Sequence, residues 1–220
     1  MKNKKTILKT VLLCAFIILL FSCNKDVVEP TPPTVDYSTF TDARDGKIYK
    51  TIKIKNQEWM AENLSFETSS GSWIYWNAFS EGIQNGRLYT WEAAQQAAPA
   101  GYHLPTDSEW KQLEISLGMS KYSADSTNFR GTNEGTFLKA TSKWAENGNG
   151  TDTFGFSALP AGFRSNIGNY LAIHWQGYWW TASESDTSSA WVRYISTNNT
   201  KVSRNISFKG DGYSVRCVKN

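Results

Sequence analysis

Residues 101–118 read GYHLPTDSEWKQLEISLG, which is the clearest local structural signal in the chain. Thr106 and Glu109 have the spacing of a capping box, in which each side chain accepts a hydrogen bond from the other residue's backbone N–H at the start of a helix. Gly118 is suited to the C-terminal end of the same helix. One apolar stripe runs between them, formed by Trp110, Leu113 and Leu117. This pattern predicts an amphipathic helix that packs against a core.

The residues before this helix predict further regular structure. A second helix is expected over Thr90–Ala98, which is rich in alanine and stops at Pro99. Farther upstream, Asp45-Gly46 favours a turn. The strand expected after that turn places three isoleucines on one face, at Ile48, Ile52 and Ile54.

The last forty residues predict a second β region. Four strands separated by turn-forming segments are expected there, over residues 178–182, 190–195, 202–208 and 213–218. Residues 119–176 carry many Gly, Asn and Ser, which is typical of long loops around short strands. The predicted fold class is therefore α+β, with two central helices, a C-terminal antiparallel meander and long loops.

The N-terminus has the layout of an export signal. Four lysines precede an uninterrupted apolar run over residues 11–21, which is too short for a membrane span of about 20 residues. The run ends in Leu20-Phe21-Ser22-Cys23, which resembles the lipobox of bacterial lipoproteins. That resemblance implies cleavage after Ser22 and lipidation of Cys23. An ordinary cleavage site with an incidental cysteine is the alternative interpretation.

These features predict three parts in the chain. Residues 1–22 are expected to be a lipoprotein signal peptide. Residues 23–36 are expected to contain the lipidated Cys23 and a Pro-rich tether, because residues 27–36 read VVEPTPPTVD. Residues 37–220 are then one domain, long enough for a single substantial core.

The charge balance gives no reason to expect a nucleic-acid partner. The chain of 220 residues has a formal net charge of +3, with 23 basic and 20 acidic residues. The four lysines at positions 2, 4, 5 and 9 belong to the predicted signal, and without them 19 basic and 20 acidic residues remain. Nucleic-acid binding requires a clustered basic surface, which a body of net charge −1 does not indicate.

The few cysteines and histidines limit metal and nucleophilic chemistry. Three cysteines are too few for a zinc site built from four thiolates. His103 lies at the start of the capped helix, where a structural hydrogen bond is the favoured role. His174 has no neighbouring carboxylate or thiol in the sequence. Paired carboxylates remain an open alternative, since their separation in space cannot be read from a sequence. No catalytic residue, metal or cofactor is assigned.

Seven short blocks span most of the predicted domain: DGKIYKT (45–51), WMAENL (59–64), GRLYTW (86–91), GYHLPTDSEW (101–110), GFSALPAGFR (155–164), YWWTAS (178–183) and GYSVRCV (212–218). In content and order they resemble the Fibrobacter succinogenes major paralogous domain, which occurs on bacterial lipoproteins and secreted proteins. Two of the blocks are also similar to the sulfatase-modifying-factor domain. The resemblance implies a C-type-lectin-like fold, with the termini close together and long irregular loops.

The resemblance also bears on the cysteines. Family members often have a cysteine where this chain has Ala98, apparently paired with the cysteine near the C-terminus. Cys217 is therefore expected to be a buried free thiol. The formylglycine-generating branch of the modifying-factor group uses a reactive cysteine pair with copper, and a domain with one cysteine cannot form that pair. A non-enzymatic role is expected, with an enzyme of this descent as the alternative.

The abundant aromatic residues supply the candidate binding site. The chain has 10 Trp, 10 Tyr and 11 Phe, and most of them fall in family blocks or on apolar faces. Exposed rings in loops can stack on sugar faces. The candidate ligand-binding residues are Tyr170, His174 and Trp175, followed by Trp73 and Trp76. The alternative is that these rings cap the core beneath the loops.

Calcium could accompany a lectin-like site, although no regular loop spacing supports one. The available oxygen ligands are Asn147, Asn149, Asp152, Asp186 and Asn198, and Asn/Asp-rich turns explain them equally well.

Together these observations predict a lipoprotein of the bacterial cell envelope, anchored in the lipid bilayer of the outer membrane through acylated Cys23. Its domain is expected to recognise a glycan or an envelope protein. A purely structural envelope component is a further alternative.

Overall fold

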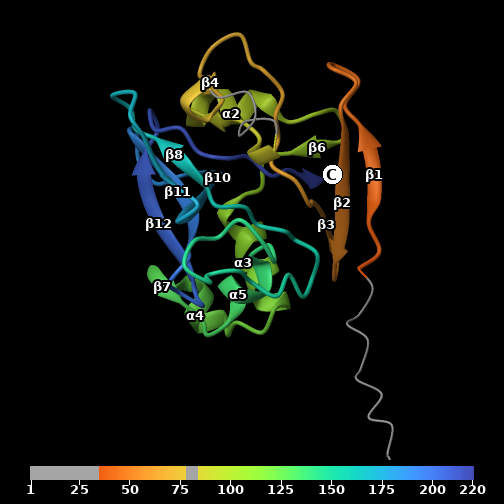
Figure 1. Cartoon of the computed structure of the whole chain (residues 1–220), viewed down its shortest axis with the longest axis vertical. Helices are drawn as coiled ribbons and strands as arrows, with labels where there is room; N and C mark the ends of the chain where they lie inside the picture. The colour runs from red at the N-terminus through yellow and green to blue at the C-terminus, as the bar shows by residue number, and fades with distance from the viewer. Residues whose placement is uncertain (1–34, 78–83) are drawn as a thin grey trace, which may run out of the picture. The chain divides into compact units, whose positions relative to one another are not determined.

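The computed structural model describes residues 35–77 and 84–220, and within them most regular structure is β. One sheet has five strands in the spatial order β1 (Ser38–Thr41), β2 (Ile48–Ile54), β3 (Gln57–Met60), β13 (Val218–Lys219) and β6 (Tyr102–His103). A second sheet has six, in the order β7 (Asn128–Arg130), β12 (Val202–Phe208), β11 (Ser189–Ser196), β10 (Gln176–Glu184), β8 (Ala161–Arg164) and β9 (Tyr170–Ile173). Figure 1 shows these two sheets on opposite sides of the domain. A small third sheet pairs β4 (Ser72–Trp73) with β5 (Leu88–Tyr89).

The last strand of the chain belongs to the same sheet as the first. Val218 of β13 is paired with Trp59 on one side and with His103 on the other. In the second sheet β10, β11 and β12 are consecutive antiparallel neighbours, which confirms the predicted C-terminal meander. β8 pairs with β10 in parallel, so the second sheet is mixed.

Both predicted central helices are present. α2 (Trp91–Ala97) begins after Thr90, and α3 (Asp107–Ser116) begins after Thr106 with both hydrogen bonds of the capping box formed. Figure 1 shows α3 between the two sheets and α2 near their upper end. Each helix has its own core cluster with residues from both sheets. The α3 cluster is built around edge-to-face rings, including Trp59, Trp110 and Phe156.

A buried ionic network holds α3 against the second sheet. The Asp107 carboxylate accepts hydrogen bonds from Arg193 of β11 at 2.8 Å and from Arg204 of β12 at 2.8 and 2.9 Å. Two helical turns later, Glu114 accepts a bond from Arg193 at 2.7 Å and another from Arg130 of β7 at 2.5 Å. The network therefore joins α3 to three strands without leaving either buried carboxylate unpaired.

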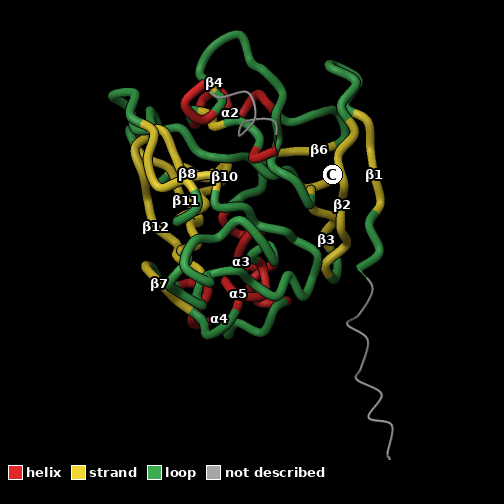
Figure 2. The backbone as a smooth tube through the Cα atoms, viewed as in Figure 1, coloured by secondary structure: helices red, strands yellow, loops and turns green. Residues whose placement is uncertain are grey.

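The structure corrects several sequence-based expectations. Residues 119–176 contain two short helices, α4 (Lys121–Asp125) and α5 (Glu134–Leu138), where long loops around strands were predicted. The loops are nevertheless extensive, as Figure 2 shows in green between α5 and β8. Residues 213–218 do not form a fourth meander strand, because only isolated bridges at Tyr213 and Ser214 precede β13.

The predicted face of β2 is also only partly buried. Ile52 and Ile54 are core residues, but Ile48 is 62% exposed, because Tyr49 and Thr51 on the opposite face are the buried residues at that end of the strand.

The predicted signal peptide, Cys23 and nearly all of the tether lie outside the described residues. Among residues 35–77 and 84–220, no helix is both long and apolar enough to cross a bilayer.

Candidate functional site

Part of the sequence-nominated aromatic set forms one cluster at the end of the domain where β4 and β8 lie (Figure 1). Trp73 ends β4, and Tyr75 and Trp76 lie in the 3-10 turn that follows, η1 (Tyr75–Asn77). The Tyr75 ring lies 5.3 Å from Tyr170 of β9 and 5.9 Å from Trp76, measured between centroids. We define the aromatic cluster as these four residues with Arg164.

Arg164 lies against two rings of the aromatic cluster. Its guanidinium carbon lies 4.0 Å from the centroid of the Trp73 ring and 5.8 Å from that of Tyr170. Arg164 and Tyr170 are direct partners in the β8–β9 register, so the backbone fixes their relative position. The cluster thus joins the segments of Trp73 and Arg164, which are about ninety residues apart in the sequence. The Arg164 cation lies against the faces of aromatic rings.

The rings of the aromatic cluster differ in exposure. Tyr75 is 5% exposed and anchors the turn, and its burial raises the pKa of the phenol. Trp76 is 71% exposed, while Trp73 and Tyr170 are half-buried. Trp76 also has a φ of 49°, in the left-handed region that bulky residues rarely adopt. Backbone conformations of this kind concentrate at functional sites, where surrounding packing stabilises them.

His174 and Trp175 lie outside the aromatic cluster. They form the turn between β9 and β10, at the opposite end of β9 from Tyr170. His174 Nδ1 lies 3.2 Å from the carbonyl oxygen of Lys143, and Trp175 is 44% exposed. The structure therefore brings Trp73, Trp76 and Tyr170 together and places the other two nominated residues elsewhere.

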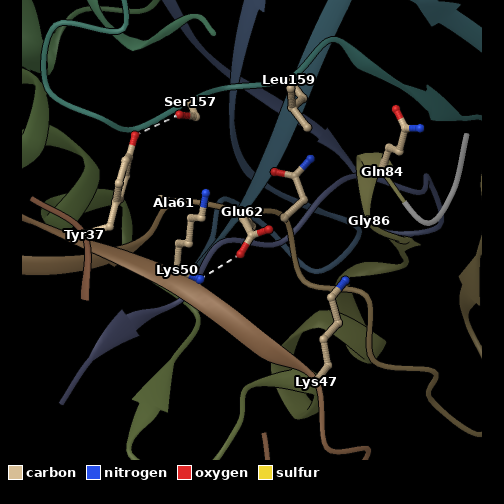
Figure 3. Close-up of a pocket in the computed structure, with 10 residues that line it drawn as sticks. Tyr37, Lys47, Lys50, Ala61, Glu62, Gln84, Gly86, Ser157 and Leu159 are labelled. Atoms are coloured by element: carbon tan, nitrogen blue, oxygen red, sulfur yellow. Dashed lines mark hydrogen bonds between the residues drawn. The ribbon is translucent and has the colours of Figure 1, made fainter. Parts of the chain in front are cut away.

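A separate pocket of about 180 Å³ lies beside β2 (Figure 3). Lys47, Lys50 and Glu62 contribute its charged groups, and Tyr37 and Ser157 form one side through a hydrogen bond of 3.3 Å. The backbone N–H of Lys50 donates to the Glu62 carboxylate at 2.7 Å. The small volume and the charged groups on its walls suit a small polar ligand.

The floor of this pocket is a structural hydrogen-bond network. The Asn63 amide donates to the carbonyl of Asn85 and to Ser214, and its oxygen accepts from Trp179 and Arg216. All four hydrogen-bonding positions of the Asn63 side chain are thereby occupied.

Arg216, beneath the pocket, is completely buried. Its guanidinium also donates to the carbonyl oxygens of Phe156 and Ser157, and burial lowers its pKa to about 9. Three of the seven sequence blocks therefore meet in the core, through Asn63, Phe156, Ser157 and Arg216. The pocket lies over this network, in which every hydrogen-bonding position of Asn63 is occupied.

The other polar candidates have structural roles in the described residues. His103 lies 2.7 Å from both the Glu109 carboxylate and the Asn220 side chain, as a structural hydrogen bond requires. Cys217 is a buried free thiol, as predicted, and burial raises its pKa to about 12.

Four of the five oxygen ligands considered for calcium accept hydrogen bonds from nearby residues in the sequence. Asn149 accepts from the Trp144 backbone, Asp152 from Ser157, Asp186 from Ser188 and Asn198 from Ser196. No group of three or more His, Cys, Asp or Glu side chains that could hold a metal ion occurs within residues 35–77 and 84–220.

Sequence reasoning missed Arg164 and Tyr75, the residues that connect the aromatic cluster. The sequence does contain one indication for Arg164. This residue ends the GFSALPAGFR block and directly precedes the loop that contains Tyr170, His174 and Trp175. Tyr75 stands between the two nominated tryptophans, and its burial depends on a contact with β9 that local sequence does not encode.

The described residues define a mainly β member of the α+β class, with α3 between two open sheets and no closed barrel among the described strands. The sequence model of the Fibrobacter succinogenes major domain matches residues 52–219, so the chain belongs to that family. Neither the curated proteins nor the solved structures include a match to this chain.

Proposed function

We propose that this chain is a lipid-anchored lipoprotein of the bacterial cell envelope whose domain recognises glycans through the aromatic cluster. The observation that carries the proposal is that Arg164 lies against Trp73 and Tyr170, while Tyr75 joins Tyr170 to Trp76, whose ring is 71% exposed. Sugar rings present apolar C–H faces that stack on aromatic side chains, while their hydroxyls need polar neighbours. The aromatic cluster provides both kinds of contact at one surface.

A C-type-lectin-like fold is part of this proposal. It is supported by the sheet that contains both β1 and β13, which places the ends of the domain in one layer, and by the long irregular segment before β8. A non-catalytic role is supported by the environment of Cys217, whose buried thiol with a pKa of about 12 is a poor nucleophile at neutral pH.

Glycan array binding of the full-length chain tests the proposal. Wild-type protein is expected to bind at least one glycan class, and Trp73→Ala with Trp76→Ala is expected to abolish that binding. Tyr122→Ala is the matched control, since Tyr122 is an 86% exposed aromatic on α4, outside the cluster. An array on which wild-type protein binds nothing would rule out the carbohydrate form of the proposal. A pull-down from envelope extracts that depends on the same tryptophans would then favour a protein partner.

The membrane anchor has its own test. Acyl chains on Cys23 would hold the protein stably in the bilayer, because each buried methylene contributes about 0.8 kcal/mol. Cys23→Ala is therefore expected to move the full-length protein from the membrane fraction to the soluble fraction. Retention of that variant in the membrane fraction would contradict lipid anchoring through Cys23.

A further inference from the structure

The guanidinium of Arg164 lacks a carboxylate partner among the described residues. Its one hydrogen bond there is from Nη1 to the carbonyl oxygen of the adjacent Ser165, at 3.4 Å. Nε is buried without a hydrogen-bond partner, and no described carboxylate forms an ion pair with this side chain. By comparison, Arg130, Arg193 and Arg204 all pair with buried carboxylates of α3. Within residues 35–77 and 84–220, Arg164 is thus a cation without a paired anion.

The fold holds Arg164 firmly in place. Its backbone N–H donates to Gly212 at 3.0 Å, and its carbonyl accepts from the Gly212 N–H at 2.6 Å. On the side-chain level, the Trp73 ring covers one face of the guanidinium at 4.0 Å. A Cβ placed on Gly168 would lie 3.2 Å from Nη2, so the turn between β8 and β9 also approaches this group closely. A restrained guanidinium loses less conformational entropy when it binds an anion.

We propose that Arg164 makes the aromatic cluster selective for acidic sugars, whose carboxylate receives hydrogen bonds from the guanidinium while the sugar ring stacks on Trp76. This inference rests on the proposed glycan recognition and names its ligand class. Planar guanidinium groups match carboxylates because two parallel N–H bonds reach two oxygens. Because Nε is buried, the two terminal nitrogens Nη1 and Nη2 are the donors that would meet the ligand carboxylate.

Calorimetric titration of the full-length chain with matched sugars tests this selectivity. The probes are a galacturonic acid trisaccharide and its methyl ester, which differ in charge but retain the same rings. Charge-assisted hydrogen bonds are about twice as strong as neutral ones, so the acid is expected to bind roughly tenfold more tightly than the ester in low salt. Arg164→Gln is expected to remove the difference between the acid and the ester by weakening binding of the acid, whereas Lys121→Gln on α4 is expected to preserve the difference.

The possible failures can be told apart. Equal affinity of wild-type protein for acid and ester, or a preference for the acid that survives in Arg164→Gln, would overturn the role of Arg164 and leave glycan recognition standing. Absence of binding to both sugars would overturn the proposal that the ligands are acidic sugars. Glycan recognition itself would be overturned only if the wild-type protein also bound nothing on the glycan array. Loss of the preference in Lys121→Gln would show that net charge, and not Arg164, is responsible.

Discussion

Asp107→Asn is expected to destabilise the domain strongly, because it removes a negative charge between two arginines. Arg193 is fully buried, and in the variant Glu114 remains its one carboxylate partner, a carboxylate already shared with Arg130. Breaking a buried ion pair by removing one partner costs about 3–5 kcal/mol. For a domain of this size, each kcal/mol lowers the Tm by about 2–4 °C, so the Tm is expected to fall by roughly 6–20 °C.

The same carboxylate predicts how stability depends on pH. Burial favours a higher pKa for Asp107, but the hydrogen bonds and charges of Arg204 and Arg193 outweigh it and lower the pKa from 3.8 to about 2. Because the folded pKa lies below the unfolded one, this stabilisation is complete above about pH 4 and is lost as the pH falls toward 2. A difference of almost two pKa units corresponds to about 2 kcal/mol.

Urea unfolding of the full-length chain at pH 7, 4 and 3, followed by circular dichroism, measures both effects. Asp125→Asn is the control, because Asp125 is an exposed member of the same region that pairs with Lys111 at 2.8 Å. Its free energy of unfolding is expected to stay close to that of the wild type. The reasoning is refuted if Asp107→Asn unfolds at the same urea concentration as this control, or if it retains the full acid sensitivity of the wild type.

Three further predictions concern the core and the cluster surface. The buried Cys217 thiol, with its pKa of about 12, is expected to resist a thiol-labelling reagent in native protein and to react once urea unfolds the chain; rapid native labelling would contradict its burial. Gly86→Ala is expected to cost more than Gly101→Ala in urea unfolding, because both have positive φ but a Cβ at Gly86 would lie 2.8 Å from the carbonyl oxygen of Leu64 and a Cβ at Gly101 meets open space. Equal losses would mean that the contact is relieved easily. Trp76→Ala is expected to leave the Tm within about 2 °C of the wild type, since the ring is 71% exposed, and a larger fall would indicate a structural role.

The parts of the fold that could be predicted are those encoded by neighbouring residues. The capping box at Thr106 and Glu109 needs only a spacing of three, and it formed as expected. The signal for α4 was equally local, because Ser120 caps that helix by accepting from the Ser123 backbone, but the abundance of small polar residues favoured a loop. Residues 213–218 have a strand-like sequence, yet they run between the two sheets and bridge to different elements, which sequence alternation does not reveal.

The candidate site depends more heavily on distant contacts. Aromatic content and position between family blocks were sufficient to nominate Trp73, Trp76 and Tyr170. They could not predict which of the nominated loops lie side by side in the fold. Arg164 stacks on Trp73 because β8 and β4 approach each other in the fold, at a sequence separation of about ninety residues. Trp175 was nominated on the same grounds as Tyr170, but the two residues lie at opposite ends of β9.

The most direct test of glycan recognition by the aromatic cluster is the Kd of Trp76→Ala for the glycan that wild-type protein binds most tightly. Trp76 is suited to this measurement because its ring is largely exposed, so its removal is expected to change binding without destabilising the fold. Truncation of a central aromatic anchor costs about 2 kcal/mol or more, so the Kd is expected to rise about 30-fold, with Tyr122→Ala unchanged. A Trp76→Ala variant that binds as tightly as the wild type, while Trp175→Ala loses binding, would contradict the aromatic cluster as the binding site.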